Sequence, residues 1–353
     1  MRIGRAVVGL SALAAAAGAA AGWFFSAPRY RGPKSDHFDG RRFHNLAGVA
    51  EAGAPEMVRW IFDRDPGKWE SWTVVEQVVP PRRVEGDALR VTWVGHATML
   101  IQTAGVNILT DPIWSMRCSP VSWAGPKRRH APGVRFEDLP PIDAVVISHN
   151  HYDHMDVPTI DRLRRDHSPR FLVPLGNARM VRGATELDWW QSEALMPDVR
   201  VHAVPAQHFS SRGLADRNAN LWSGYVIETP GGNVFFAGDT GWGPHFERIR
   251  ERFGRVRLAI LPVGAYRPRY IMEPVHISPQ EAIRAARALG AASTIPMHYF
   301  TFRLGDDGQS EPADVLRSEG ATTAGFSIIR PGEVWTAPSS AGVRFDPAQS
   351  SDQ

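Results

Sequence analysis

Residues 143–148, DAVVIS, form a short run of apolar and β-branched side chains. Such a run is typical of a strand that is buried on both faces, as in the middle of an α/β sheet. Four residues able to bind metals or transfer protons follow it directly: His149, His151, Asp153 and His154. We therefore expect a buried strand whose end carries a dense polar cluster.

Similar strand-like runs recur along the chain, whereas strong helix signals are few. The clearest helix is predicted in ISPQEAIRAARALG, where Ser278 and Glu281 can form a capping box and Gly290 ends the pattern. Another is predicted at 157–166. This succession favours an α/β sandwich of two mixed sheets with helices on the outer faces. The predicted strands are 89–94, 98–103, 106–110, 143–148, RFLVP, VRVHAVPAQH, LWSGYVIET, NVFFAGDT, RLAILPVG, STIPMH and GFSIIRPGEVW.

The N-terminal part of the chain differs in composition from the rest. Residues 6–25 carry no charge and follow two arginines, so 1–29 is predicted to be a membrane anchor in the cell envelope. The alternative is a signal peptide that is cleaved on export. Residues 30–87 are predicted to wrap the folded part, with a short helix near 55–63. The folded domain is expected at 88–340, and a flexible tail at 341–353.

The composition allows a large core and argues against nucleic acid as a partner. Hydrophobic residues make up 43% of the chain, and the formal net charge is only +3. The nearest approach to a basic run is GPKRRH at 125–130, which we predict to be a solvated loop, with contact to an anionic head group as the alternative. The single cysteine, Cys118, excludes an internal disulfide and is expected to be a small buried residue.

The spacing within the histidine cluster indicates ligands for two metal ions. In extended backbone His149 and His151 point the same way, so they can bind one ion together. If the chain then turns into a helix, Asp153 and His154 project elsewhere and can serve a second ion. Asp156 is given no ligand role. Three further candidates lie at the ends of other strand-like runs: His208, Asp239 and His298. Of these, Asp239 could bridge the two ions.

A metal site explains this cluster better than a buried hydrogen-bond network does. Without a cation, each charged group would carry a desolvation cost of several kcal/mol. Histidine and aspartate without cysteine suit zinc first, with iron or manganese as alternatives, so we expect two Zn²⁺ ions. Two neighbouring ions can hold a bridging hydroxide and polarise the group under attack. The expected chemistry is therefore hydrolysis at phosphorus or at a carbonyl.

Several stretches between residues 91 and 303 carry a resemblance to a known family. They include WVGHATMLIQ, LTDPIWS, LPPIDAVVISHNHYDHMD, PAQHFSSR, FFAGDTGW, VHISPQEA and MHYFTF. In these stretches the chain resembles the metallo-β-lactamase superfamily, and within it the N-acyl-phosphatidylethanolamine-hydrolysing phospholipase D family. The resemblance implies an αββα fold and a dizinc site.

The resemblance also implies roles for individual residues. One zinc would be held by His149, His151 and His208, and the other by Asp153, His154 and His298, with Asp239 as the bridge. Asp111 of the TDP motif resembles an aspartate that supports the histidine loop. His276 of VHIS matches a histidine near the scissile phosphate; the alternative is a helix-entry residue without chemistry. The expected catalytic residues are Asp153, Asp239 and His276.

The activity that the resemblance implies is phospholipase D-type hydrolysis of a phosphodiester in N-acylated phosphatidylethanolamine or a related glycerophospholipid, by metal-bound hydroxide. The expected partners are a phospholipid substrate and a membrane surface, with a homodimer as a further expectation. A lactonase or other hydrolase of a soluble metabolite on the same fold is one alternative. A non-catalytic, metal-stabilised envelope protein is another, although a structural zinc site needs only four ligands and no second ion.

Overall fold

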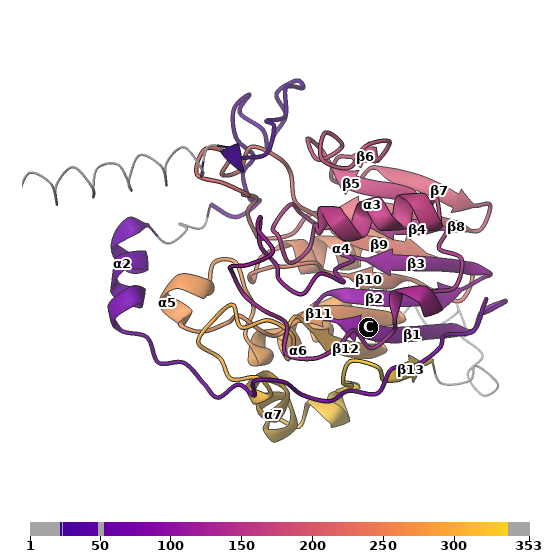
Figure 1. Ribbon diagram of the computed structural model, residues 1–353. Helices are drawn as coiled ribbons and strands as arrows, with labels where there is room; N and C mark the ends of the chain where they lie inside the picture. Colours follow the sequence, from indigo (N-terminus) through magenta and orange to yellow (C-terminus); the bar gives the residue numbers. More distant parts are fainter. Residues whose placement is uncertain (1–21, 23, 49–52, 338–353) are drawn as a thin grey trace, which may run out of the picture.

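The computed structural model describes residues 22, 24–48 and 53–337, and two sheets packed face to face form its centre (Figure 1). Most of the predicted N-terminal anchor and the predicted tail at 341–353 lie outside the described residues. Within the described part of the chain, no helix has the length and apolar character needed to cross a bilayer. The two-sheet architecture confirms the predicted α/β sandwich of mixed sheets with outer helices.

The first sheet has seven strands among the described residues, in the spatial order β13-β1-β2-β3-β4-β5-β6. Strands β3, β4, β5 and β6 run parallel, and the others pair antiparallel. The bounds are β1 Leu89–Gly95, β2 Thr98–Thr103, β3 Val106–Thr110, β4 Ala144–Val146, β5 Arg170–Pro174, β6 Thr185–Leu187 and β13 Val334–Thr336.

The second sheet has six strands in the described ranges, in the order β12-β11-β10-β9-β8-β7. Strands β10, β11 and β12 run parallel, whereas β7, β8 and β9 continue the sheet antiparallel. The bounds are β7 Ser192–Met196, β8 Val199–Val204, β9 Gly224–Glu228, β10 Val234–Phe236, β11 Leu258–Pro262 and β12 Ser293–Met297.

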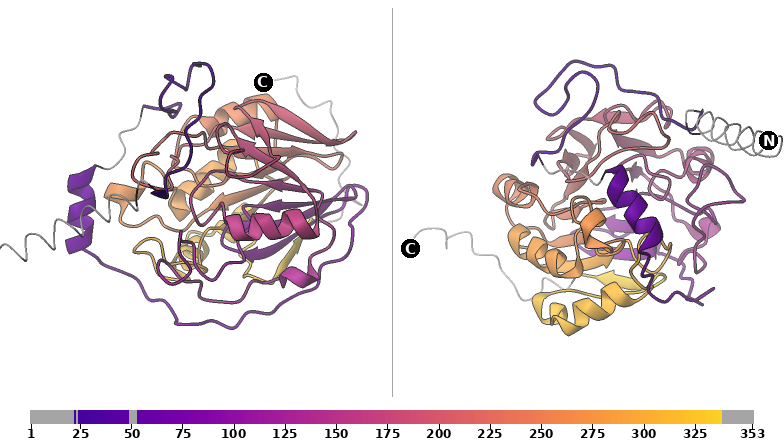
Figure 2. Two further views of the ribbon diagram at one scale, coloured as in Figure 1. Left: turned by 45° about the horizontal axis from the view of Figure 1, so that its top comes forward. Right: turned by 90° about the vertical axis from the view of Figure 1, so that its left-hand side faces the viewer.

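Helices cover the outer faces of the two sheets (Figures 1 and 2). On one side α3 buries Ile160 and Leu163 against Val145 and Val173 of the first sheet. On the other side α6 packs on β11 and against α4 and α7. The helices are α2 Ala54–Phe62, α3 Val157–Asp166, α4 His245–Phe253, α5 Arg269–Met272, α6 Pro279–Leu289 and α7 Glu311–Ser318, with 3₁₀ turns η1 Phe136–Asp138 and η2 Ala321–Ala324.

Local sequence signals account for the best-predicted elements. Helix α6 has the predicted capping box between Ser278 and Glu281, and Gly290 ends it in the left-handed conformation. The hairpin between β2 and β3 turns on Ala104 and Gly105, which both have positive φ, as a two-residue turn between strands of this twist requires. The apolar faces of both sheets then form one large core between them.

Some boundaries and elements differ from the predictions. The strand predicted to run to His208 ends at Val204, and of the segment 325–335 only Val334 and Trp335 belong to strand β13. Helices α4, α5 and α7 and strands β6 and β7 were not predicted. These elements are short, and their burial comes from neighbours distant in sequence, so their own patterns are weak.

The segment GPKRRH is partly buried, so the prediction of a solvated loop was wrong for two of its residues. Arg128 and His130 are buried, whereas Lys127 is exposed. The Arg128 guanidinium donates to the carbonyl oxygens of Ser115 (3.1 Å) and Ile113 (2.9 Å). These hydrogen bonds offset the loss of hydration that makes an isolated buried charge costly.

The chain from residue 53 to 87 follows the outside of the sandwich before entering β1 (Figure 2). Its backbone makes three hydrogen bonds to two loops: Gly67 N–H to Asp306 O (2.7 Å), Thr73 N–H to Arg129 O (2.6 Å) and Val78 N–H to Gly133 O (2.9 Å). Helix α2, predicted near 55–63, begins this path. The exact domain boundaries stay a prediction.

Candidate metal centre

Five strands end at one edge of the sandwich, and each is followed by a candidate ligand. His96 comes directly after β1 and His298 directly after β12. His149, Asp239 and His208 follow β4, β10 and β8 within four residues. Loops at one edge of a rigid sheet core are where binding and catalytic residues usually lie. The fold therefore brings together side chains that span most of the domain's sequence.

Three histidines form what we call the imidazole group: His149, His151 and His208. The Nδ1 atom of His151 lies 2.8 Å from His149 Nε2 and 3.3 Å from His208 Nε2. His208 donates its Nδ1–H to the carbonyl oxygen of Val275 at 2.9 Å, so its Nε2 carries a free lone pair. The predicted first ligand set is thus brought together by the structure.

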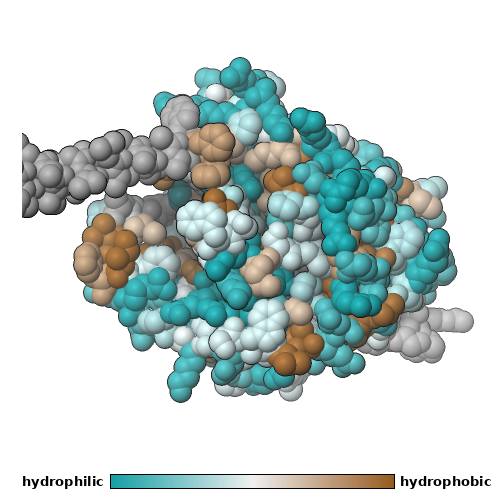
Figure 3. Space-filling view, viewed as in Figure 1, coloured by the Kyte–Doolittle hydropathy of each residue, from teal (hydrophilic) through white to brown (hydrophobic). Residues whose placement is uncertain are grey.

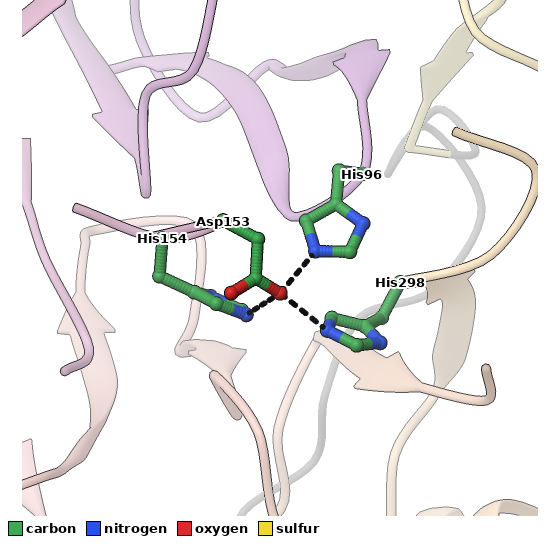
Figure 4. Close-up of side chains that lie close together, drawn as sticks. All are labelled: His96, Asp153, His154 and His298. Atoms are coloured by element: carbon green, nitrogen blue, oxygen red, sulfur yellow. Dashed lines mark hydrogen bonds and ion pairs between the residues drawn. The ribbon is translucent and has the colours of Figure 1, made fainter. Parts of the chain in front are cut away.

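Four residues form the carboxylate group: His96, Asp153, His154 and His298 (Figure 4). Asp153 Oδ2 lies at the middle, 2.8 Å from His96 Nε2 and 3.3 Å from the Nε2 atoms of both His154 and His298. The structure therefore unites the three residues predicted for a second ion. It adds His96, which was not predicted.

Asp239 lies between the two groups. Its Oδ2 atom is 3.1 Å from His154 Nε2 and from His298 Nε2, and 3.8 Å from His208 Nε2. Its other oxygen, Oδ1, is buried and has no hydrogen-bond partner among the described residues. This place suits the predicted bridge, although the bridging role itself stays a prediction.

The chemistry of the donor atoms fits bound cations. Burial lowers the pKa of His149 and His208 well below the usual value, and that of His151 to about 4. A proton on His151 Nδ1 can satisfy only one of the two facing nitrogens, His149 Nε2 or His208 Nε2, whereas a cation among the three rings would satisfy every lone pair. Burial alone would also lower the pKa of His298, but Asp239 and Asp153 raise it to about 9. Metal ions would replace such protons, because ligands must be deprotonated.

Asp111 braces one histidine in each group. This buried carboxylate accepts hydrogen bonds from Ser148 N–H, Ser148 Oγ–H and His154 Nδ1–H, each at 2.6 Å. The Ser148 oxygen in turn lies 2.9 Å from His149 Nδ1. Such outer contacts fix which nitrogen of each ring is free to bind a metal. The placement is that of the predicted supporting aspartate.

Strained backbone marks the same site. Asp111, His96 and His298 all have positive φ, at 36°, 54° and 67°. Residues other than glycine rarely adopt this conformation, and where they do they cluster at functional sites. Asp156, which was given no ligand role, instead accepts hydrogen bonds from Ser115 and Thr159.

His96 is a candidate site residue that was not predicted from the sequence. It is buried, and its backbone N–H donates to Thr301 Oγ at 2.7 Å. Burial lowers its pKa to about 3, so the ring is neutral and can either orient Asp153 or offer a nitrogen to an ion. One signal in the sequence could have identified it. His96 of WVGHATMLIQ lies at the end of a strand-like run, as the other candidate ligands do.

His276 lies at the edge of the cluster, with its Nδ1 atom 3.9 Å from Asp239 Oδ2. That nitrogen is buried and has no hydrogen-bond partner in the described ranges. Burial lowers the pKa of the ring to about 4, so it is neutral at physiological pH. The structure thus brings the last predicted site residue next to the others.

Comparison with solved structures agrees with this architecture. A metallo-hydrolase from Ignicoccus hospitalis matches with a TM-score of 0.52 at 23% identity, covering 70% of this chain and 98% of that one. A possible metal-dependent hydrolase from Veillonella parvula matches with a TM-score of 0.58 at 16% identity, covering 70% and 99%. At these identities the likeness concerns the fold.

Comparison with sequences adds the family. The model of the β-lactamase superfamily domain matches residues 106–299. An N-acyl-phosphatidylethanolamine-hydrolyzing phospholipase D of Caenorhabditis elegans is 34% identical over 291 residues, 75% of this chain and 82% of that protein. A mitochondrial protein of the same name from Saccharomyces cerevisiae is 34% identical over 236 residues, which are 64% of this chain and 50% of that protein. The chain therefore belongs to the metallo-β-lactamase superfamily, as a metal-dependent hydrolase with relatives of the N-acyl-phosphatidylethanolamine-hydrolysing phospholipase D type.

Proposed function

We propose that this hydrolase cleaves the phosphodiester of N-acylated phosphatidylethanolamine or a related glycerophospholipid, on the head-group side, with two zinc ions as cofactors. The observation that carries the proposal is a cavity with a polar, metal-binding floor and a long apolar wall. The names of the nematode and yeast relatives support the same substrate class.

The cavity has a volume of about 380 Å³ and opens over the two ligand groups. Its floor consists of His151, Asp153, Asp239, His276 and His298. Its wall comes from α2, α5 and four loops, and consists of Met57, Trp60, Phe209, Ala265, Ile271, Met272, Val275 and Leu304. A glycerophospholipid has the same division between a charged head and apolar chains, so this lining suits it better than it suits a wholly polar metabolite.

The proposed metal ligands are the predicted ones, with His149, His151 and His208 on one ion, Asp153, His154 and His298 on the other, and Asp239 between. Bound zinc ions lower the pKa of water and neutralise charge that develops on a phosphoryl group. The protein's own part is to orient and to move protons. Arg217 lines the cavity and brings a positive charge that complements a phosphate. The neutral His276 can hydrogen-bond to the substrate or accept a proton at Nδ1.

Helix α2 supports a membrane surface as the place of reaction. Val58, Ile61 and Phe62 are 52%, 66% and 82% exposed, and Figure 3 shows the resulting apolar patch over α2. The adjoining side of the helix lines the cavity through Met57 and Trp60. The buried Asp306 carboxylate holds α2 there, accepting from Trp60 Nε1 at 2.8 Å and from Arg64 Nε at 2.6 Å. An exposed apolar patch of this kind beside a site suits a lipid surface.

Association with a membrane of the cell envelope through the N-terminal segment is part of the proposal, with cleavage and export as the alternative. The homodimer stays a prediction.

The test is a panel of substrates given to the zinc-loaded protein. Mixed micelles would contain N-acyl-phosphatidylethanolamine, phosphatidylethanolamine or phosphatidylcholine, and a parallel set would contain soluble lactones and phosphodiesters. We expect mass spectrometry to detect phosphatidate and N-acylethanolamine from the first lipid, and no product after treatment with a chelator.

Asp239→Asn is the matched control for contaminating lipases, because it keeps the size of the side chain but removes the charge. Lactone hydrolysis without phosphatidate release would contradict the phospholipid substrate. It would favour the soluble-metabolite hydrolase instead.

A further inference from the structure

Asn45, in the extension that precedes the catalytic domain, makes a paired contact with His208. Its Oδ1 atom accepts the His208 backbone N–H at 3.0 Å, and its Nδ2 donates to the His208 carbonyl oxygen at 2.9 Å. The Trp222 indole N–H also donates to Asn45 Oδ1, at 3.1 Å. One side-chain amide thus satisfies both main-chain groups of a proposed metal ligand.

His208 needs such support because no strand holds it. Strand β8 ends at Val204, four residues earlier. The preceding residue, Gln207, bonds through its N–H to Thr240 Oγ at 3.0 Å and through its carbonyl oxygen to Gly241 N–H at 2.7 Å. The Nδ1–H bond to Val275 fixes the ring of His208, while Asn45 fixes its backbone.

The segment that carries Asn45 is itself firmly seated. Phe38 and Phe43 are buried in a cluster with Trp189 and Trp222, and they pair with each other in a β-bridge. His37 stacks on Trp189, with ring centroids 4.4 Å apart, and bonds to Asp188 through Nε2 at 2.8 Å. A side chain on an anchored segment can hold its partner at a defined place.

We infer that Asn45 is a positioning residue of the metal centre, which keeps His208 Nε2 aligned with the nitrogens of His149 and His151 and so makes the N-terminal extension part of the site. This inference rests on the proposed role of His208 as a metal ligand. Contacts that orient a ligand typically change metal affinity by about 10-fold to 100-fold when they are lost.

The experiment measures metal binding, not turnover. Full-length wild type, Asn45→Ala, Asn45→Asp, His44→Ala and His208→Ala would be stripped of metal and titrated with Zn²⁺ against a chromogenic chelator. Metal content would be counted by mass spectrometry. His44→Ala is the matched control, because this neighbouring side chain is exposed and bonds only to Asp39 among the contacts of the described residues.

For Asn45→Ala we expect one of the two zinc ions to bind roughly 10-fold more weakly, with the other within about twofold of wild type. Asn45→Asp keeps the acceptor for the His208 N–H but turns an oxygen toward the His208 carbonyl. Its affinity for the weakened zinc ion should therefore lie between those of Asn45→Ala and wild type. If Asn45→Ala does not fold, Asn45→Asp is the variant that tests the inference. His44→Ala should match wild type.

Equal weakening of both ions, or a lower Tm of the metal-free protein with unchanged affinities, would overturn the inference, because either result describes a purely structural contact. If His208→Ala loses an ion and the Asn45 variants do not, the inference alone fails. If His208→Ala binds zinc as wild type does, the ligand assignment fails and the inference fails with it.

Discussion

The two ligand groups of the metal centre differ in charge and in the way they are held. The imidazole group consists of three neutral rings, and His208 is positioned by the neutral amide of Asn45 and the carbonyl of Val275. The carboxylate group is organised around Asp153. With Asp239 shared, the proposed ion at the imidazole group would have one carboxylate near it, whereas the other ion would also have Asp153. The first ion would therefore keep more of its positive charge. This difference in charge predicts that the two proposed ion positions are not equivalent, and that their affinities for zinc can be changed separately.

The largest effect is expected from Asp239→Asn, which removes the charge of a carboxylate that lies between the two groups. Activity should fall by more than about 100-fold, since even loss of an orienting contact costs 10-fold to 100-fold. Both zinc affinities should fall together, as measured by titration against a chelator. If the variant loses only one ion, Asp239 belongs to one ligand group, and its proposed role as a bridge between the two groups is contradicted.

Asp111→Asn should have the next largest effect and should also act on both groups. The variant loses acceptor capacity toward Ser148 and His154, so the rings of His149 and His154 would no longer be held in one tautomer. We expect both zinc affinities to fall by roughly 10-fold. The free energy of unfolding should fall by about 3 kcal/mol, because a buried pair loses one charged partner. Urea unfolding of the metal-free protein would measure this, and Asp138→Asn at an exposed arginine pair is the control.

His96→Gln sharpens the comparison, because this side chain touches the carboxylate group alone. Its Nε2 atom lies 2.8 Å from Asp153 Oδ2, whereas the imidazole group is held by other contacts. One zinc affinity should fall by about 10-fold, with the other unchanged. Together with Asn45→Ala, which should affect the opposite ion, this variant tests whether the two positions are separable. If each variant weakened both zinc ions equally, the two positions would not be separable.

The smallest effect is expected at His37, where stability should depend on pH. Burial would lower the pKa of His37, but hydrogen bonds to Asp188 and Asp36 outweigh it and raise the pKa. The charged ring therefore stabilises the fold fully below the usual value, and this contribution disappears as pH rises through the raised pKa. His37→Gln should lose about 1 kcal/mol at pH 5.5 and less at pH 9. Urea unfolding of both proteins measures the difference, and a loss that grows with pH would contradict the assignment.

The sequence alone was sufficient for the architecture and for most of the candidate ligands. Local patterns specify local structure, so the runs at β1, β2 and β3, the capping box of α6 and the H-x-H-x-D-H spacing could all be interpreted in place. The prediction that His149 and His151 serve one ion and Asp153 and His154 another followed from the end of one strand and the turn after it. These features depend on residues a few positions apart.

Only the tertiary structure decided which distant residues complete and support the site. His96, Asn45 and the wall of α2 reach the centre because five strand ends meet at one edge and because the extension folds back over it. Burial of Arg128 likewise depends on carbonyl groups that a loop happens to present. The sequence determined what each strand end carries, but sheet order and long-range packing determined which of those side chains lie together in one ligand group. The physical reason is that contacts between distant segments leave no periodic pattern in the chain.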